Sequence, residues 1–267
     1  MCIAILNKKQ SVLEKETLRN CWIANQDGAG MLYVKEGQMV IFKELKSFDR
    51  FYKQYLKAKE VTPFDMILHF RITTHGNTDL KNCHPFLVNS KLGFAHNGIL
   101  DVDADKDKSD TRVFNETVLR NLPRTFYKNQ AILFLLDEFC SGSKLVFLDN
   151  KGYSAIVNEG DGETDNEGNW YSNSSYKGRY VYCGSGNSYD YDYTTSSGKA
   201  DDVLYWGYDT QGELVFYNAD GDFVTGVNFC DICEKVYDEG EKCPDCEKYK
   251  EEAVEAMIDE ADEEMGG

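Results

Sequence analysis

Two apolar patterns, one typical of strands and one typical of helices, follow each other along the first 160 residues. Their order restricts the fold of this chain more than any other feature. Short runs with the patterning of strands alternate with stretches in which apolar residues recur at helical spacing. No internal repeat is evident. Strands or hairpins are predicted at residues 2–7, 30–45, 64–73, 86–99 and 144–159, the hairpin at 30–45 turning at Glu36 and Gly37.

Helices are predicted at three places among these strands. In residues 47–60, one apolar helical face is formed by Phe48, Phe51, Tyr52, Tyr55 and Leu56. A second helix is expected at 109–123, starting at Ser109 or Asp110, and a third, more buried helix at 129–142. Strands, helices and further strands in this order are typical of a layered α+β domain.

The chain is expected to contain three regions. A domain at residues 2–183 is followed by a loop or linker at 184–200, where the sequence loses periodicity and becomes rich in Gly, Ser and Tyr. Residues 201–267 are interpreted as a β-hairpin, a cysteine cluster and an acidic C-terminal helix.

Composition excludes several classes of function. The formal net charge of −17 would repel phosphate backbones, so no nucleic-acid partner is expected. No apolar run is long enough to span a bilayer and no signal-peptide pattern opens the chain, so we expect a cytoplasmic protein without a membrane partner. In that compartment the nine cysteines are expected to be thiols or metal ligands rather than disulfides.

A cysteine directly follows the initial methionine. A side chain as small as that of Cys2 permits removal of Met1, which would leave one residue carrying both a thiol and a free α-amine. Such a pair is a nucleophile with its own base. The alternative is an ordinary buried strand, since "IAIL" follows directly.

All four histidines lie between His69 and His96. Their spacings are wide and irregular and lack the helical i, i+4 pairing of zinc hydrolases, which disfavours a metal site. The "HNG" at the end of this stretch has two interpretations. It is either a two-residue hairpin turn or a place where the Asn97 amide and the Gly98 backbone N–H are aimed at one point, as in an oxyanion hole.

Five motifs in one order resemble a known family. An N-terminal "MC" is followed by "FRITTHG", "NCHPF", "AHNGI" and "SDT", as in the class II glutamine amidotransferases. The resemblance covers about residues 2 to 160 and departs from the family pattern at Ile3 and Ile72. It implies an N-terminal-nucleophile (Ntn) hydrolase with a four-layer αββα sandwich.

The resemblance also implies roles for individual residues. Cys2 matches the nucleophile, with its freed α-amine as the base, and Asn97 and Gly98 match the oxyanion hole. The position of His84 matches a structural residue of the family. Arg71, Thr74 and His75 match family positions that hold the α-carboxylate of glutamine. Asp110 matches the position that receives its α-ammonium.

Elementary chemistry agrees with these roles. An α-amine with a pKa of about 7.7 to 8 accepts a proton near neutral pH, as a base for a thiol requires. The guanidinium of Arg71 suits a carboxylate, and a helix dipole would keep Asp110 ionised. Without the resemblance, Asp110 would be interpreted as a helix cap and Arg71 as half of a surface ion pair.

The leading functional hypothesis is amide hydrolysis through a Cys2 thioester. The substrate would be glutamine or another γ-glutamyl compound, and ammonia or an amine would leave. Residues after about 200 are too few for a synthase, so we expect a stand-alone protein that passes ammonia to a separate synthase, with no catalytic cofactor. The alternative is an inactive interaction protein that uses the same fold and the C-terminal region to bind a partner.

The stretch "CDICEKVYDEGEKCPDC" contains two Cys-x-x-Cys pairs separated by a short loop. Four thiolates at this spacing form the tetrahedral site that structural zinc prefers. A redox disulfide pair or free thiols remain the alternatives. The sequence therefore predicts a C-terminal zinc ribbon with the ligands Cys230, Cys233, Cys243 and Cys246. The remaining cysteines are interpreted as small core residues, namely Cys21, Cys83, Cys140 and Cys183.

Overall fold

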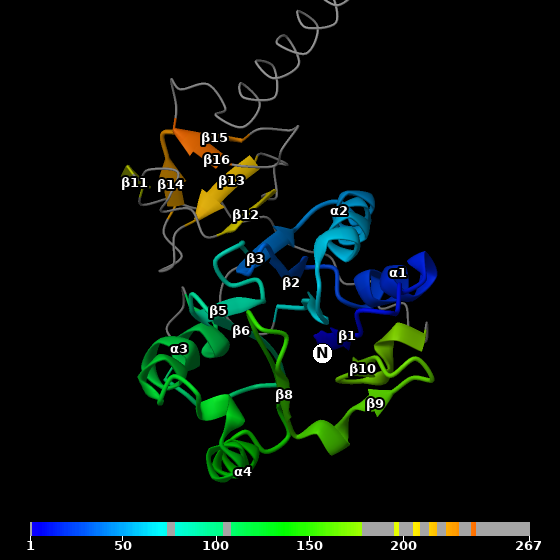
Figure 1. Ribbon diagram of the computed structural model, residues 1–267, viewed down its shortest axis with the longest axis vertical. Helices are drawn as coiled ribbons and strands as arrows, with labels where there is room; N and C mark the ends of the chain where they lie inside the picture. Colours follow the sequence, from blue (N-terminus) through cyan, green and yellow to red (C-terminus); the bar gives the residue numbers. More distant parts are fainter. Residues whose placement is uncertain are drawn as a thin grey trace, which may run out of the picture. The chain divides into compact units, whose positions relative to one another are not determined.

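The computed structural model describes residues 2–73, 78–103, 108–177, 195–197, 205–208, 214–217, 223–229 and 236–238. The chain divides into two compact units (Figure 1). Unit 1 consists of Met1–Asp190 and Tyr205–Val215, and unit 2 consists of Tyr191–Leu204 and Phe216–Gly267.

Unit 1 contains two sheets and four α-helices among the described residues. The larger sheet has the strand order β12-β3-β2-β4-β1-β10-β9, and the smaller sheet has the order β5-β6-β7-β8. The strands of the larger sheet are β1 (Ile3–Asn7), β2 (Ala29–Lys35), β3 (Gln38–Glu44), β4 (Met66–Phe70), β9 (Glu163–Thr164), β10 (Trp170–Tyr171) and β12 (Tyr205–Tyr208). Those of the smaller sheet are β5 (Phe86–Asn89), β6 (Leu92–Asn97), β7 (Lys144–Asp149) and β8 (Ser154–Val157). The helices are α1 (Lys15–Ala24), α2 (Phe48–Val61), α3 (Asp110–Thr117) and α4 (Gln130–Phe139).

Short 3₁₀ turns complete unit 1, at Leu119–Asn121, Phe126–Lys128, Glu159–Asp161 and Ser174–Lys177. Within unit 1, neighbouring strands are antiparallel, except that β12 runs parallel to β3. In unit 2, β14 (Phe223–Thr225) pairs with β11 (Thr195–Ser197) and with β13 (Leu214–Tyr217), and β15 (Val227–Phe229) pairs with β16 (Val236–Asp238). None of the described helices is long and apolar enough to cross a membrane.

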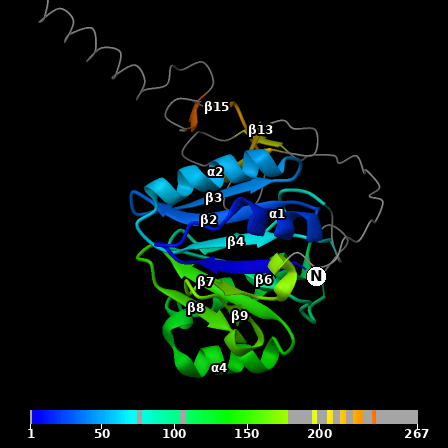
Figure 2. The same cartoon turned by 90° about the vertical axis from the view of Figure 1, so that its right-hand side faces the viewer.

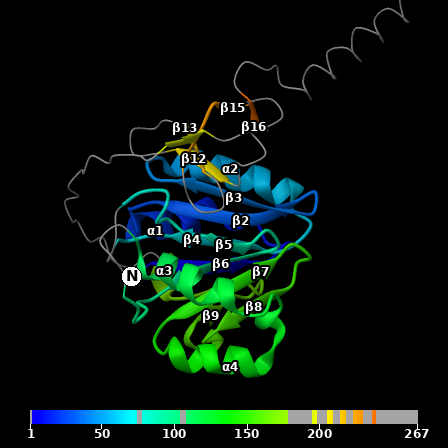
Figure 3. The ribbon, with the colours of Figure 1, turned by 90° about the vertical axis from the view of Figure 1, so that its left-hand side faces the viewer.

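The sheets of unit 1 lie face to face with helices on both outer sides. In Figure 2, α1 and α2 cover one face of the larger sheet, and the smaller sheet faces the other side. Figure 3 shows α3 and α4 on the outer face of the smaller sheet. The prediction of a mixed α and β fold is confirmed.

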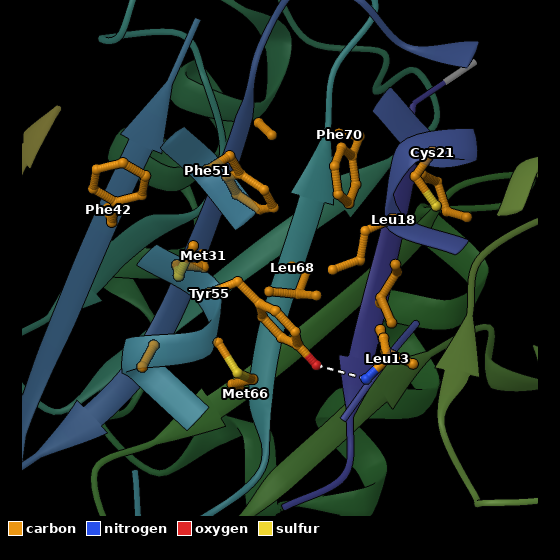
Figure 4. Packing of buried hydrophobic residues seen from close by; sticks show 14 of the residues in the cluster. Leu13, Leu18, Cys21, Met31, Phe42, Phe51, Tyr55, Met66, Leu68 and Phe70 are labelled. Atoms are coloured by element: carbon orange, nitrogen blue, oxygen red, sulfur yellow. Dashed lines mark hydrogen bonds between the residues drawn. The ribbon is translucent and has the colours of Figure 1, made fainter. Parts of the chain in front are cut away.

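Strand alternation produces this arrangement. In β1, Ile3 and Ile5 point into the core shared with α1 and α2, so Cys2 and Ala4 face the smaller sheet. The helix-side core contains Phe51, Tyr55, Met31 and Leu68 (Figure 4). The hydroxyl of Tyr55 accepts a hydrogen bond from the Leu13 backbone N–H at 2.8 Å and donates one to Asn7 Oδ1 at 3.0 Å.

Glycines allow a close approach in the space between the sheets. A Cβ atom added at Gly30 in β2 would lie 2.1 Å from the carbonyl oxygen of His84, and one at Gly93 in β6 would lie 2.7 Å from the Leu32 side chain. No larger residue fits without movement of the backbone at the first position. The lack of a Cβ atom at these two glycines therefore allows the polar ends of the strands to lie close together.

Most of the predicted strands and helices are present. The hairpin β2–β3 turns at Glu36 and Gly37, both with positive φ, and α2 begins after Ser47, which caps it by accepting from the Arg50 N–H at 3.3 Å. The segment "DGETDNEGN" (residues 161–169) contains β9 and the five residues that connect it to its antiparallel partner β10.

The structure differs from the sequence interpretation at two helices. Helix α1 was not predicted, because its apolar face is narrow and buries only Leu18 and Cys21. Helix α4 is not the more buried one: Phe134 is 61% exposed, Leu135 66% and Phe139 55%. Most of the expected linker at 184–200 lies outside the described residues, apart from β11.

We predict that Gly30→Ala destabilises unit 1, because the added methyl group meets a backbone oxygen that cannot rotate away. The free energy of unfolding should fall by about 1–3 kcal/mol, measured by urea denaturation. Gly160→Ala is the matched control, since nothing lies within 4 Å of its added Cβ, and a change within about 0.5 kcal/mol is expected. Equal stability of both variants would contradict the close approach.

Candidate functional site

Cys2 directly precedes β1 in the larger sheet. The backbone N–H of Ile72 donates to its Sγ, and the Sγ lies 3.3 Å from the Ile72 carbonyl oxygen as well. The Asn173 side chain donates from Nδ2 to the Cys2 carbonyl oxygen at 2.7 Å. The thiol is therefore held by backbone groups just beyond β4 and by a side chain just beyond β10.

Burial dominates the electrostatics of this thiol. Desolvation raises the pKa of Cys2 above its ordinary value, while the Ile72 N–H and the guanidinium of Arg71 oppose the increase. At neutral pH the sulfur is therefore protonated, and it becomes a strong nucleophile only when a base removes the proton. This arrangement calls for a base close to the sulfur.

Asn97 is the last residue of β6 and comes from the facing sheet. Phe94 of the same strand points toward α3 and α4, so Asn97 faces β1. Its Nδ2 lies 2.8 Å from Ser172 Oγ, which also accepts from the Ala4 N–H at 2.9 Å. Ser172 thus links the strand of Cys2 to Asn97.

Gly98 continues directly from Asn97 with a φ of +146°, a conformation that favours glycine. A Cβ added here would lie 2.1 Å from Ser143 Oγ. The same hydroxyl donates to the Ile99 carbonyl oxygen at 2.9 Å, which fastens the backbone after Gly98. Position 98 is therefore restricted to glycine by both conformation and space.

Arg71 follows β4 and is only 4% exposed. Its backbone N–H donates to the Gly28 carbonyl oxygen at 2.8 Å, and its own carbonyl accepts from the Asp27 N–H at 3.0 Å. The carboxylate of Asp27 accepts from the Thr73 N–H at 2.6 Å. The segment after β4 is thereby clamped where it passes Cys2, whereas Thr74 and His75 lie outside the described residues.

Asp110 is the first residue of α3. Its Oδ2 accepts from the Leu100 N–H at 2.7 Å and its Oδ1 from the Thr111 N–H at 2.6 Å. Ser109, not Asp110, caps the helix by accepting from the Arg112 N–H at 3.2 Å. Asp110 thus anchors the segment that follows Gly98, in addition to any role toward a ligand.

Three of the four histidines form a buried cluster that their spacing in the sequence does not reveal. His69 Nε2 and His84 Nδ1 each lie 3.0 Å from the His96 carbonyl oxygen and 3.1 Å from each other. His96 Nδ1 lies 2.8 Å from Thr111 Oγ1. Burial lowers the pKa to about 3 for His69 and about 4 for His96, and that of His84 well below its ordinary value. All three are neutral at physiological pH.

Other residues of the site were not found from the sequence. Ser172 and Ser143 belong to no motif, and their contacts join residues far apart in the chain. Lys43 on β3 is buried: its Nζ donates to the Leu80 carbonyl oxygen at 3.0 Å and lies 4.9 Å from the Phe86 ring centre. Desolvation lowers the pKa of Lys43 to about 7.

The four cysteines of the predicted ribbon lie outside the described residues. Within the described part of the chain, no three His, Cys, Asp or Glu side chains are arranged to hold a metal ion. Of the cysteines expected in the core, Cys21, Cys83 and Cys140 are buried, as predicted; Cys183 lies outside the described residues.

Comparison with known proteins relates part of the chain to one family. Residues 16–116 match the family described as "Glutamine amidotransferases class-II". This span contains Arg71, Asn97, Gly98 and Asp110 and begins after Cys2. It is therefore similar in sequence to the domain that the motifs indicated.

Among solved structures, the chain is similar to the glutamine phosphoribosylpyrophosphate (PRPP) amidotransferase from B. subtilis in its complex with ADP and GMP. The identity is 17% and the TM-score 0.42, over 64% of this chain and 40% of that one. The chain thus spans less than half the length of that protein. No curated protein matches the chain.

The histidine cluster predicts how stability depends on pH. The folded pKa values lie below the value of about 6.5 in an unfolded chain, so the unfolded state binds more protons in acid. The free energy of unfolding should therefore fall as the pH drops from about 6.5 toward 4, by up to about 4 kcal/mol per pH unit for three such groups. Urea denaturation at several pH values measures this slope.

His69→Gln isolates the contribution of one member of the cluster. The variant should reduce the slope by up to about 1.4 kcal/mol per pH unit. The comparison with wild type removes the contribution of the carboxylates, which both proteins share. An identical slope in the two proteins would contradict a neutral buried His69.

Proposed function

We propose that this chain is an amide hydrolase of the class II glutamine amidotransferase type. One observation carries the proposal: the Cys2 thiol accepts a hydrogen bond from the N–H of Ile72, the neighbour of Arg71, and Ser172 Oγ links Ala4 on β1 to Asn97 at the end of β6, directly before Gly98. The sequence similarity over residues 16–116 supports the same activity. Taken together, they supply a nucleophile, oxyanion donors and a cation for a carboxylate.

Removal of Met1 would give Cys2 its base. The thiol passes its proton to the freed α-amine, and the sulfur attacks the carbonyl carbon of the substrate's side-chain amide. The oxyanion that forms accepts hydrogen bonds from the Asn97 amide and the Gly98 N–H. The carbon–nitrogen bond then breaks, and the amine returns the proton to the departing ammonia.

Water completes the reaction by attacking the thioester carbonyl carbon on Cys2, again through an oxyanion. The carbon–sulfur bond breaks, glutamate leaves and the sulfur regains a proton. For a γ-glutamyl amide, an amine leaves in place of ammonia in the first half. The raised pKa of the buried Cys2 thiol makes the nearby base necessary.

The substrate is proposed to be glutamine or a γ-glutamyl compound with a free α-amino acid end. Arg71, with Thr74 and His75, would bind the α-carboxylate, and Asp110 would bind the α-ammonium. The Asp110 carboxylate accepts its described bonds from Leu100 and Thr111, and a carboxylate offers about four lone-pair sites. Capacity therefore remains on Oδ2 for an ammonium donor.

We also propose that unit 1 is an Ntn-type αββα sandwich. The two facing sheets with helices on both outer sides support this assignment, as does the position of Cys2 at the end of a central strand. Ammonia released here would be consumed by a separate synthase, with which the protein would associate.

Structural zinc in unit 2 is a further part of this proposal. The antiparallel pair β15 and β16 is connected by residues 230–235, which contain Cys230 and Cys233. A Cys-x-x-Cys that follows β15 in the sequence would supply one half of a zinc ribbon, and Cys243 with Cys246 would supply the other half. A four-thiolate site leaves zinc no open position, so its role would be structural.

The decisive experiment concerns Cys2. Cys2→Ala should lower ammonia release from glutamine by about 10³-fold or more, because the variant lacks the thiol that forms the thioester in the proposed mechanism. Cys140→Ala, at a buried cysteine after α4, is the control and should retain activity. A coupled ammonia assay measures turnover, and circular dichroism checks the fold.

Mass spectrometry with a glutamine-analogue electrophile reports Met1 removal and thiol modification together. Labelled Cys2 at a free N-terminus is the expected result. Retained Met1, or wild-type turnover by Cys2→Ala, would overturn the mechanism and favour an interaction protein that kept the fold.

The zinc assignment is tested separately. Elemental analysis should find about one zinc per chain, and the double variant Cys243→Ser with Cys246→Ser should lose it while keeping glutaminase activity. Cys140→Ser is the control, expected to keep the metal. Loss of activity in a double variant that remains folded would place the ribbon in the catalytic mechanism.

A further inference from the structure

Ser172 lies just after β10 and makes contacts on two sides of the site. It is fully buried. Its backbone N–H donates to the Ala4 carbonyl oxygen at 2.9 Å, and its Oγ accepts from the Ala4 N–H at 2.9 Å. On the other side, Oγ lies 2.8 Å from the side-chain amide of Asn97. One hydroxyl therefore joins the strand of Cys2 to the side chain proposed to stabilise the oxyanion.

Counting hydrogens at this hydroxyl restricts how the amide is oriented. A serine hydroxyl has one donor and two acceptor sites. The Ala4 N–H can only donate, so it occupies an acceptor site. With Asn97 Nδ2 donating as well, the hydroxyl proton has no acceptor among the described residues, and the buried Asn97 Oδ1 has no partner among them.

Rotation of the Asn97 carboxamide by half a turn lets the hydroxyl proton and Asn97 Oδ1 pair with each other. The rotation needs no extra space, because the two orientations occupy the same volume. Ser172 Oγ–H then donates to Asn97 Oδ1, and the Nδ2 group takes the place of the buried oxygen. Two N–H donors are left there without an acceptor. Unpaired donors are what an oxyanion hole holds ready before the negative charge develops.

We propose that Ser172 is a positioning residue that holds Asn97 with Nδ2 turned into the site, and this rests on the function proposed above. Cys2 directly precedes β1 and Ala4 is the second residue of that strand, so strand alternation places their side chains on the same side. The bond from the Ala4 N–H to Ser172 therefore sets the amide relative to the sulfur. Ser172 touches no substrate; it acts through Asn97.

The first test compares acylation with simple alkylation in Ser172→Ala. Loss of the hydroxyl frees the amide to rotate, so kcat for glutamine should fall about tenfold or more with KM within about twofold. Alkylation of Cys2 by iodoacetamide should keep its wild-type rate, because displacement at a saturated carbon forms no oxyanion. A merely structural role would lower both rates together.

The second test is a double-mutant cycle with Asn97→Ala. If Ser172 acts only through Asn97, Ser172→Ala should have no further effect on kcat in the Asn97→Ala background. Additive losses, unchanged kcat in Ser172→Ala, or parallel loss of alkylation would each overturn the proposal. If Ser172→Ala does not fold, Ser172→Cys serves in the same cycle, because its thiol fills the site and donates only weakly.

Ser11→Ala provides a matched control. Ser11 is a buried serine that accepts from Asn169 Nδ2 at 2.8 Å, near the opposite end of β1. Its loss should leave kcat unchanged. A wild-type protein that releases no ammonia overturns the proposed function and the role of Ser172 with it, whereas an active wild type with additive variants overturns the role of Ser172 alone.

Discussion

The desolvation of polar groups between the two sheets is the constraint on which the site depends. Gly30 and Gly93 let the sheets approach, and the polar strand ends are thereby enclosed together with Cys2, Lys43 and the histidine cluster. Burial is the first cause of the shifted pKa for the thiol, the lysine and each histidine, and in every case it favours the neutral form. Cys2, Lys43 and the three histidines are thus shifted toward their neutral forms beside the guanidinium of Arg71.

This explains why the framework around Cys2 consists mainly of hydrogen bonds. Ile72, Asn173 and Ser172 hold the sulfur and its strand through backbone atoms and neutral side chains. Such bonds are short-range and directional, so they fix geometry without the long-range fields of ion pairs. Arg71 is the buried cation beside the thiol, and its backbone is clamped on both sides.

Local periodicity made much of the fold predictable. Strand-like apolar patterns located β1, β4 and the hairpin β2–β3, and the apolar helical face from Phe48 to Leu56 located α2. Helix α1 was not predicted, because tertiary packing of Leu18 and Cys21, rather than a wide apolar face, stabilises it. The apolar composition of α4 predicted a more buried helix, but its Phe134 and Leu135 are exposed. Motifs predicted roles for Cys2, Asn97 and Asp110, and these roles stay predictions. No motif pointed to Ser172 or to the histidine cluster, because their contacts join segments distant in sequence.

The pairing of β1 has a consequence for how the protein tolerates insertions. This strand is held on both sides, by β4 through Ile3 opposite Phe70 and by β10 through Ile5 opposite Tyr171. Side chains alternate faces along a strand, so the register of these pairs determines which face of the sheet the preceding residue, Cys2, points to. One extra residue between Cys2 and Ile3 would turn the thiol away from Asn97 while leaving every strand in place. Under the proposed mechanism, the spacing between the cysteine and β1 is therefore as strictly constrained as the identity of the cysteine.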